Sequence, residues 1–153
     1  ITDTRGAGIM NKLFDGYAPW FGRIPQRNTG ALISDRRGKV TTYACVNTAD
    51  RGELFVSVGT EVYDGMVIGE RNKTNDLSLN ITREKKLSNM RSSGSDNTVT
   101  VRPPRELSLD QSIEFISEDE LVEITPMSVR LRKMDLDQQK REAAQKKERR
   151  SDK

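Results

Sequence analysis

The stretch from Thr82 to Thr98, TREKKLSNMRSSGSDNT, has the side chains that contact a phosphate backbone. Arginine and lysine neutralise phosphates, arginine can grip one phosphate with two donors, and short hydroxyls and amides bind phosphate or sugar oxygens. Gly94 would let the backbone approach a ligand closely. No aromatic residue lies between Thr82 and Arg105, so stacking on bases is not expected there. The candidate RNA-binding residues are Arg83, Lys85, Lys86, Asn89, Arg91, Ser92, Ser93 and Ser95.

Positive charge is concentrated in the same part of the chain. Residues 82–105 contain six basic residues and two acidic ones, a net charge of +4, in a chain whose total is +3. Local charge of this kind favours a polyanionic partner, of which nucleic acid is the commonest. A solvated basic loop without a ligand explains the residues equally well, because phosphate contact requires little beyond charge. The basic residues are Arg83, Lys85, Lys86, Arg91, Arg102 and Arg105.

The sequence lacks the residues of several other chemistries. The chain has no histidine, which removes the Ser-His-Asp triad, the Cys-His dyad and histidine metal ligands. The phosphate-binding loop G-x-x-x-x-G-K-[ST] is absent, and NKTN has Asn75 where a guanine-reading motif needs aspartate. The acidic run SEDE is interpreted as a solvated turn at a helix end, because adjacent acids point in different directions. We therefore predict no catalytic residue, no metal site and no cofactor in this chain.

The single cysteine, Cys45, bears on compartment and on packing. One cysteine cannot form an intramolecular disulfide, which fits a reducing compartment such as the cytoplasm. Cys45 lies in an apolar run, where a buried small hydrophobic residue is expected rather than a reactive thiol. No apolar stretch approaches the ~20 residues that span a bilayer, so no membrane partner is expected. The chain begins with Ile1 rather than Met, and we expect it to be a piece of a longer protein.

Strands must position the basic stretch. Alternation of apolar and polar residues brackets it on both sides, in Leu77–Ile81 and in Thr98–Arg102, so it is expected to be a long excursion between two strands. The sequence DRRG is expected to be a hairpin loop that joins the second and third strands of the chain. The predicted strands are Ile9–Phe14, Ala31–Ser34, Lys39–Val46, Leu54–Val58, Glu61–Glu70, Leu77–Ile81, Thr98–Arg102, Leu121–Thr125 and Ser128–Lys133.

One helix is predicted in the segment LSLDQSIEFIS. Ser108 and Gln111 have capping-box spacing, in which each side chain satisfies a free amide of the first turn. Leu109, Ile113 and Ile116 form a single apolar stripe at helical spacing. With one clear helix among many strands, the chain is predicted to have an α+β fold with a mostly antiparallel sheet.

The last strand and the tail have contrasting patterns. In SVRLRK, Val129 and Leu131 are expected to face inward and the arginines outward. The charged tail, residues 134–153, has helix-forming composition but no apolar face. Isolated helices of that length are marginal, so the tail is expected to be disordered unless it docks on something.

Long collinear strings resemble a known family. DTRGAGIMN, RNTGALIS, ADRGELFV, GTEVYDGMVIGE, NDLSLN, KKLSNMRSSGSDNTVT and PPRELSLDQSIEFISEDELVEITPMSVRLRK are similar to the C-terminal part of the BipA/TypA translational GTPases, without a visible gap over residues 2–133. The resemblance implies that residues 1–21 are the last strand of a truncated ferredoxin-like domain, as in domain V of elongation factor G. It implies that residues 22–133 are the family's own C-terminal domain, followed by the charged tail.

The resemblance also implies a function. The parent would be a monomeric, ribosome-binding GTPase of the cytoplasm that acts in stress adaptation and large-subunit assembly. GTP and Mg²⁺ would bind in its catalytic domain, upstream of Ile1. Lys85 to Asn97 match the family's long loop, which reaches toward the peptidyl-transferase centre and contacts large-subunit rRNA and the acceptor end of the A-site tRNA. The alternative is a structural role, in which this domain docks on the upstream domains of its own chain and the loop is incidental.

Overall fold

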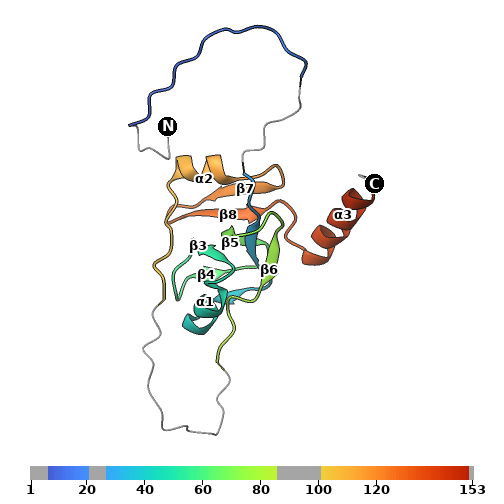
Figure 1. Cartoon of the computed structure of the whole chain (residues 1–153). Helices are drawn as coiled ribbons and strands as arrows, with labels where there is room; N and C mark the ends of the chain where they lie inside the picture. The colour runs from blue at the N-terminus through green and yellow to red at the C-terminus, as the bar shows by residue number, and fades with distance from the viewer. Residues whose placement is uncertain (1–6, 21–26, 86–100, 152–153) are drawn as a thin grey trace.

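The computed structural model describes residues 7–20, 27–85 and 101–151 of the chain (Figure 1). Residues 7–20 have no regular secondary structure, and Ile9 and Leu13 are 92% and 94% exposed. The strand expected over Ile9–Phe14 is therefore not formed. A strand needs a partner to satisfy its backbone N–H and C=O groups, and within the described residues none lies beside this segment. Its assignment to a ferredoxin-like domain stays a prediction.

The described elements form one mixed domain, which confirms the α+β prediction (Figure 1). The main sheet has the strand order β6-β1-β5-β8-β7, with β3 also paired to β5, and a second sheet consists of β2 and β4. All pairs are antiparallel except β1 with β6. The strands are β1 (Ala31–Ser34), β2 (Gly38–Lys39), β3 (Gly52–Leu54), β4 (Glu61–Val62), β5 (Met66–Arg71), β6 (Leu77–Leu79), β7 (Glu120–Ile124) and β8 (Val129–Lys133), and the helices are α1 (Thr42–Thr48), α2 (Leu109–Phe115) and α3 (Gln138–Ser151).

Strand β5 organises the main sheet because three strands pair with it. It lies beside β1 on one side, and on the other it pairs first with β8 and then with β3. Val67 is opposite Leu131, and Gly69 is opposite Leu54. A Cβ on Gly69 would lie 2.3 Å from the carbonyl oxygen of Glu53, so only glycine lets β3 approach this closely.

Apolar residues on both faces of the central strands build two cores. Leu32 and Ile68 face α1 and the small sheet, where they pack with Cys45 and Ile81. Ile33 and Val67 face the other side, with Leu131, with Phe115 of α2 and with Ile116 just after that helix. The central strands therefore have near-continuous apolar sequences, because α1 covers one face of the sheet and α2 the other. Burial of Cys45, at 3% exposure, confirms its prediction as a packing residue.

The predicted DRRG hairpin and the strand over Lys39–Val46 are both wrong. Strand β1 pairs with β5 and β6, whereas β2 pairs with β4 in the other sheet, so no hairpin joins β1 to β2. Only Gly38–Lys39 is a strand, and Thr42–Thr48 is helix α1. The side chain of Thr41 caps this helix by accepting from the amide of Ala44 at 3.2 Å. Tertiary packing thus overrides the β propensity of a sequence rich in Thr, Tyr and Val.

The capping box of α2 is confirmed, but its buried face differs from the prediction. Ser108 accepts from the amide of Gln111, and the Gln111 side chain accepts from the amide of Ser108. Leu109 and Ile113 are 41% and 53% exposed, whereas Ser112 is buried. Phe115 extends this buried side by stacking edge-on against Phe55 at 5.0 Å between ring centroids. The helix is therefore rotated away from its predicted stripe, because the aromatic pair fixes which side meets the sheet.

Two further expectations at the C-terminal end are corrected. Leu131 is buried as predicted, but Val129 is 38% exposed and Lys133 is the buried residue at 1%. Residues 138–151 of the tail form helix α3 and are not disordered. Arg141 holds the start of this helix by donating to the carbonyl oxygens of Asp135 and Leu136. Leu136 lies against Gly65, so the tail does dock, through its first turn.

Gly30 fixes the turn between β5 and β6. Its amide donates to the carbonyl of Lys73 at 2.6 Å, and its carbonyl accepts from the amide of Arg71 at 2.8 Å. A Cβ there would lie 2.2 Å from the carbonyl oxygen of Asn75. Gly30→Ala is expected to destabilise the domain by about 1–3 kcal/mol or more, because the obstacle is backbone. Urea unfolding measures this, with exposed Asn28→Ala expected to stay within about 0.5 kcal/mol; equal midpoints for both variants would contradict the prediction.

Candidate nucleic-acid interface

The start of the basic stretch is held by contacts between β6, the turn after it and the N-terminus of α1. Ile81 is fully buried, and its carbonyl accepts from the amide of Thr41 at 3.2 Å. The Thr41 hydroxyl donates to the carbonyl of Arg83 at 2.5 Å. Asn80 Oδ1 accepts from both the amide and the hydroxyl of Thr82, at 3.0 and 2.9 Å. The chain therefore leaves the core at a fixed point beside α1.

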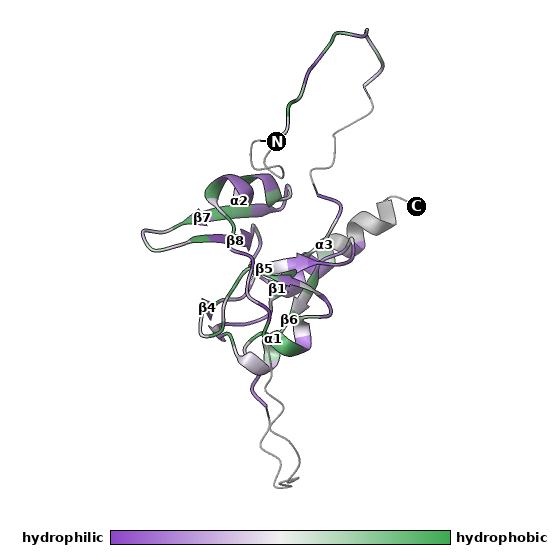
Figure 2. Cartoon of the chain, turned by 60° about the vertical axis from the view of Figure 1, so that its left-hand side comes forward, coloured by the Kyte–Doolittle hydropathy of each residue, from purple (hydrophilic) through white to green (hydrophobic). Residues whose placement is uncertain are grey.

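Only part of the predicted RNA-binding set lies in the described residues. Arg83 and Lys85 are both exposed. The segment that follows β6 runs toward the end of the molecule that also holds α1 and lies opposite α2 (Figures 1 and 2). The remaining predicted contacts lie outside the described residues, as does most of the expected strand Thr98–Arg102. Of that strand, Val101 and Arg102 have no regular secondary structure, and Val101 packs against the core. The predicted contacts outside the described residues are Lys86, Asn89, Arg91, Ser92, Ser93 and Ser95.

Arg105 does not contribute free positive charge. Its guanidinium lies 3.1 Å from a carboxylate oxygen of Glu70 and 3.5 Å from one of Glu53, and its amide donates to the carbonyl of Leu54. These contacts hold the returning chain against the edge of β3. The net charge of +4 counted over residues 82–105 therefore includes one guanidinium, that of Arg105, which is already paired with carboxylates.

A pocket of about 360 Å³ lies beside Arg83, between α1 and the residues that follow β6. Tyr43 and Asn47 line it from α1, Arg51 from the turn after α1, and Asn80 from the end of β6. Among the described residues, the guanidinium of Arg51 has no acidic partner, and neither does that of Arg83. Two guanidinium groups without an acidic partner among the described residues and one aromatic ring thus line the same pocket.

Sequence reasoning predicted only Arg83 of these five residues, and it interpreted most of α1, including Tyr43, as a strand that ends at Val46. On a strand, Tyr43 and Asn47 would share a face with Cys45, which is in the core. On a helix, residues four apart lie on one face, so Tyr43 and Asn47 point together away from Cys45. The signal in the sequence that could have found the helix is the spacing of the small residues Ala44, Cys45 and Thr48, which is helical rather than alternating. All three are buried in the structure.

The chemistry of this end of the molecule is binding rather than bond-making. Burial raises the pKa of the Cys45 thiol, so the sulfur stays protonated and is a poor nucleophile. Arginine and lysine supply donors for phosphate, and the carboxamides supply donors and acceptors. The groups present fit an anionic, hydrogen-bonding ligand.

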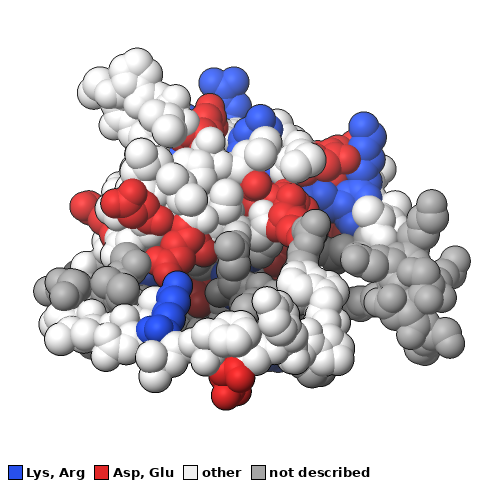
Figure 3. All heavy atoms as spheres, turned by 90° about the horizontal axis from the view of Figure 1, so that it is seen from above, with Lys and Arg blue, Asp and Glu red and all other residues white. Residues whose placement is uncertain are grey.

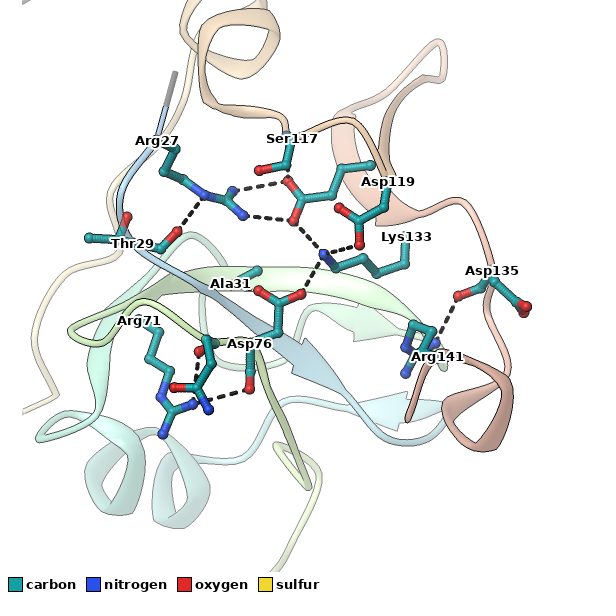
Figure 4. A network of polar contacts seen from close by, with 12 residues as sticks. Arg27, Thr29, Ala31, Arg71, Asp76, Ser117, Asp119, Lys133, Asp135 and Arg141 are labelled. Carbon is teal, nitrogen blue, oxygen red and sulfur yellow. Dashed lines mark hydrogen bonds and ion pairs between the residues drawn. The ribbon is translucent and has the colours of Figure 1, made fainter. Parts of the chain in front are cut away.

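A second polar cluster, far more buried, is centred on Glu120 and includes residues in or next to β1, β6, β7 and β8, several of which Figure 4 labels. Both carboxylate oxygens of Glu120 accept from the guanidinium of Arg27 at 2.9 Å, and one also lies 2.9 Å from Lys133 Nζ. Lys133 Nζ further contacts Asp76 at 2.5 Å and Asp119 at 2.7 Å. Asp76 in turn accepts from the amide of β1 at Ala31, at 2.8 Å. The cluster ties the segment before β1 to β6, β7 and β8.

The environment of the cluster sets its ionisation. Burial alone would raise the pKa of Glu120, but the hydrogen bonds and charges of Arg27 and Lys133 outweigh it and lower that pKa. Burial would lower the pKa of Lys133, and its three acidic partners raise it instead. Both groups are therefore charged at neutral pH. Perturbed ionisation here reflects a structural network rather than a reactive site.

Glu120 corrects the interpretation of SEDE as a solvated turn. Asp119 is exposed as expected, but the Glu120 side chain is fully buried. Its carboxylate also accepts from the amide of Ser117 at 3.1 Å, which fixes the turn from α2 into β7. The guanidinium of Arg27 completes the site by lying 4.2 Å from the centre of the Phe115 ring.

The face opposite the basic stretch has mixed charge. Seen from that side, acidic and basic side chains of the described residues are interspersed with uncharged ones (Figure 3). No helix among the described residues is long and apolar enough to cross a membrane. By contrast, Arg51, Arg83 and Lys85 are exposed cations with no acidic partner among the described residues, which suits a polyanion.

Comparison with known proteins identifies the family. The family model of the TypA/BipA C-terminal domain matches residues 29–138. The chain is 46% identical over 145 residues to the large ribosomal subunit assembly factor BipA of Bacillus subtilis, covering 94% of this chain and 24% of that protein. It is 44% identical over 147 residues to the protein of the same name from Salmonella typhimurium, with the same coverage of both chains.

A third relative agrees, and all three are much longer than this chain. The large ribosomal subunit assembly factor BipA of Synechocystis is 45% identical over 134 residues, covering 88% of this chain and 22% of that protein. The chain therefore spans about a quarter of the length of these curated relatives. The matched residues run from the segment before β1 into the start of α3, so they include both cores, the pocket beside Arg83 and all of the Glu120 cluster except Arg27. The chain belongs to the TypA/BipA family and contains its C-terminal domain.

Proposed function

We propose that this domain binds ribosomal RNA on behalf of a larger translational GTPase. Its basic stretch would contact large-subunit rRNA and the acceptor end of the A-site tRNA. The parent, a cytoplasmic protein, would hydrolyse GTP with Mg²⁺ in an upstream catalytic domain and act in large-subunit assembly and stress adaptation. The relatives are named large ribosomal subunit assembly factors, which supports the ribosome as partner.

One observation carries the proposal: exposed cations with no acidic partner among the described residues gather where the basic stretch leaves the core. Arg83 and Lys85 lie on the stretch itself, and Arg51 comes from the turn after α1. Charges placed on a rigid base can meet phosphates without first reorganising the fold. Because each phosphate contact releases condensed counterions, binding of this kind weakens steeply with salt.

The test replaces Lys85, Lys86 and Arg91 together by alanine. Binding of the chain to purified large ribosomal subunits is measured over a series of salt concentrations. If three phosphate contacts are lost, the slope of log affinity against log salt should become shallower by roughly three. Replacing Lys12, Lys140 and Lys146 by alanine removes the same charge elsewhere and should change the slope much less. An unchanged slope and affinity in the first variant would refute the RNA-binding role.

A docking role within the parent is the second candidate, and a surface feature favours it. The region of α2 and the β7–β8 hairpin leaves large apolar side chains exposed, a feature of surfaces that contact protein. Under this role, deletion of residues 85–97 would leave ribosome association of the full-length parent intact. Charge-reversing or polar substitutions on α2 would instead lower the parent's melting temperature. The exposed residues are Leu109, Ile113, Ile124, Met127 and Val129.

A further inference from the structure

We infer that the pocket between α1 and the end of β6 holds a single unstacked RNA nucleotide. The inference rests on the proposed RNA-binding function and deepens it, by naming a site outside the basic stretch. The pocket volume, about 360 Å³, lies within the range of about 300–1,000 Å³ typical of small-ligand sites. Its lining combines an aromatic ring, two guanidinium groups and two carboxamides, and the outermost of these residues, Tyr43 and Arg83, are 40 positions apart in the sequence.

The first argument is that α1 supplies the group that the basic stretch lacks. Residues 82–105 contain no aromatic side chain, and sequence-tolerant binding of single strands uses aromatic rings as stacking platforms. The fold places Tyr43 in the same pocket as Arg83. Tyr43 is half-buried, so its position is fixed by packing while one side of the residue borders the pocket.

The second argument is that the two carboxamides present free polar groups of opposite kind. Asn47 Nδ2 donates to the carbonyl of Tyr43 at 2.8 Å, which turns Asn47 Oδ1 away from that contact. Asn80 Oδ1 accepts twice from Thr82, which leaves Asn80 Nδ2 to donate. These contacts leave Asn47 Oδ1 as an acceptor and Asn80 Nδ2 as a donor on two residues that line the pocket with Tyr43, and the edge of a nucleobase has both kinds of group.

The third argument is charge. Arg51 and Arg83 enter the pocket from two different segments, with no acidic partner among the described residues. Guanidinium groups bind phosphate with two parallel donors. In a single nucleotide, the base would therefore stack on the ring and bond to the carboxamides, while the flanking phosphates would contact the two guanidinium groups. The neighbouring pocket lined by Cys45, Val46 and Leu54 has no such set, because its lining has no aromatic ring and includes the carboxylate of Glu53 beside its single guanidinium.

The test uses a fluorescein-labelled single-stranded RNA of about twelve nucleotides, within the range of single-strand site sizes, and an RNA duplex of equal length. Tyr43→Ala should weaken single-strand binding about tenfold, because base stacking is lost, and should leave the salt slope unchanged. Tyr43→Phe keeps the ring and should stay within about twofold. Tyr17→Ala removes a ring that is 98% exposed and remote in sequence, and should have no effect.

A second measurement avoids dependence on variants that fold poorly. Ultraviolet cross-linking of the unchanged chain to the same RNA, followed by trypsin and mass spectrometry, should place an adduct on the peptide Val40–Arg51, which contains Tyr43. Equal weakening of single-strand and duplex binding by Tyr43→Ala, with no adduct on this peptide, would overturn the inference. If the Lys85, Lys86 and Arg91 variant loses affinity while Tyr43→Ala does not, the pocket inference fails and the proposed function stands. If neither variant loses affinity, both fail.

Discussion

Glu120→Gln is expected to lower the free energy of unfolding by about 3–5 kcal/mol at neutral pH. The substitution keeps the size of the side chain and removes its charge. Arg27 and Lys133 then remain in a buried site without the carboxylate that both contact at 2.9 Å. Lys133 keeps Asp76 and Asp119, whereas Arg27 keeps only carbonyl acceptors and the Phe115 ring among its described contacts. Breaking a buried pair costs more than a surface pair because the remaining charge cannot return to water.

The same variant has a pH signature with a defined sign. The pKa of Glu120 is lowered in the folded state, so its stabilising contribution is fully present above the ordinary glutamate pKa of about 4.3. That contribution is lost as the pH falls through the folded-state pKa. The pKa of Lys133 is raised, so its contribution is present below about pH 10.4 and is lost as the pH rises through its folded-state pKa. The stability difference between Glu120→Gln and the unchanged chain should therefore be full at pH 7 and shrink in acid.

Urea unfolding at neutral and acidic pH measures both effects. The control is Glu114→Gln, which removes an exposed carboxylate on α2 and should change stability by less than about 0.5 kcal/mol. A loss in Glu120→Gln no larger than in the control would show that the cluster is structurally dispensable. A loss that is the same at pH 7 and in strong acid would show that the effect comes from packing rather than from charge.

Leu32→Ala is expected to destabilise the domain by about 2–5 kcal/mol. Leu32 is fully buried in β1, opposite Gly69 of β5, and packs in the core that α1 covers. Truncation leaves a cavity that the surrounding strands cannot close, because β5 is held on its other edge by β3 and β8. For a domain whose total stability is of the order of 5–15 kcal/mol, such a loss is a large fraction.

Leu13→Ala provides the matched control for this truncation. It removes the same atoms from a side chain that is 94% exposed, so the midpoint of thermal or urea unfolding should not move measurably. Because α1 lies over this core, Leu32→Ala should also weaken single-strand RNA binding if the pocket beside Tyr43 is a nucleotide site. Unchanged stability of Leu32→Ala would contradict the assignment of β1 as a central strand.

The buried cluster around Glu120 and the exposed cations near α1 are expected to have different roles, the first in stability and the second in binding. Glu120, Arg27 and Lys133 already use their hydrogen-bonding groups on one another and on neighbouring residues. They can therefore hold elements together but are not available to bind a ligand. Arg51 and Arg83 are exposed with no acidic partner among the described residues, so they can bind a ligand but add little to stability. Variants of the two sets should therefore separate cleanly, with unfolding measurements sensitive to the first and salt-dependent binding sensitive to the second.

The sequence alone determined the features that depend on neighbouring residues. Period-two alternation predicted β6 and β8, and the spacing of Ser108 and Gln111 predicted the start of α2, because a cap is made within one turn. Long collinear strings identified the family, and the local excess of lysine and arginine marked the candidate interface. Such patterns can be recognised in the sequence because the residues that form them are close together along the chain.

Only the tertiary structure decided the features that depend on distant partners. The segment after β2 became helix α1 because its Ala44 and Cys45 complete a core with Leu32 and Ile81, against the local strand propensity. Lys133 is buried because acids from positions 76, 119 and 120 surround its ammonium group, a set that alternation in β8 cannot reveal. Tyr43 meets Arg83 across 40 residues of chain because the Thr41 hydroxyl holds the Arg83 carbonyl. The periodicity of a sequence predicts which residues share one face of a helix or strand. The residues that pack against that face come from distant parts of the chain and are known only from the folded structure.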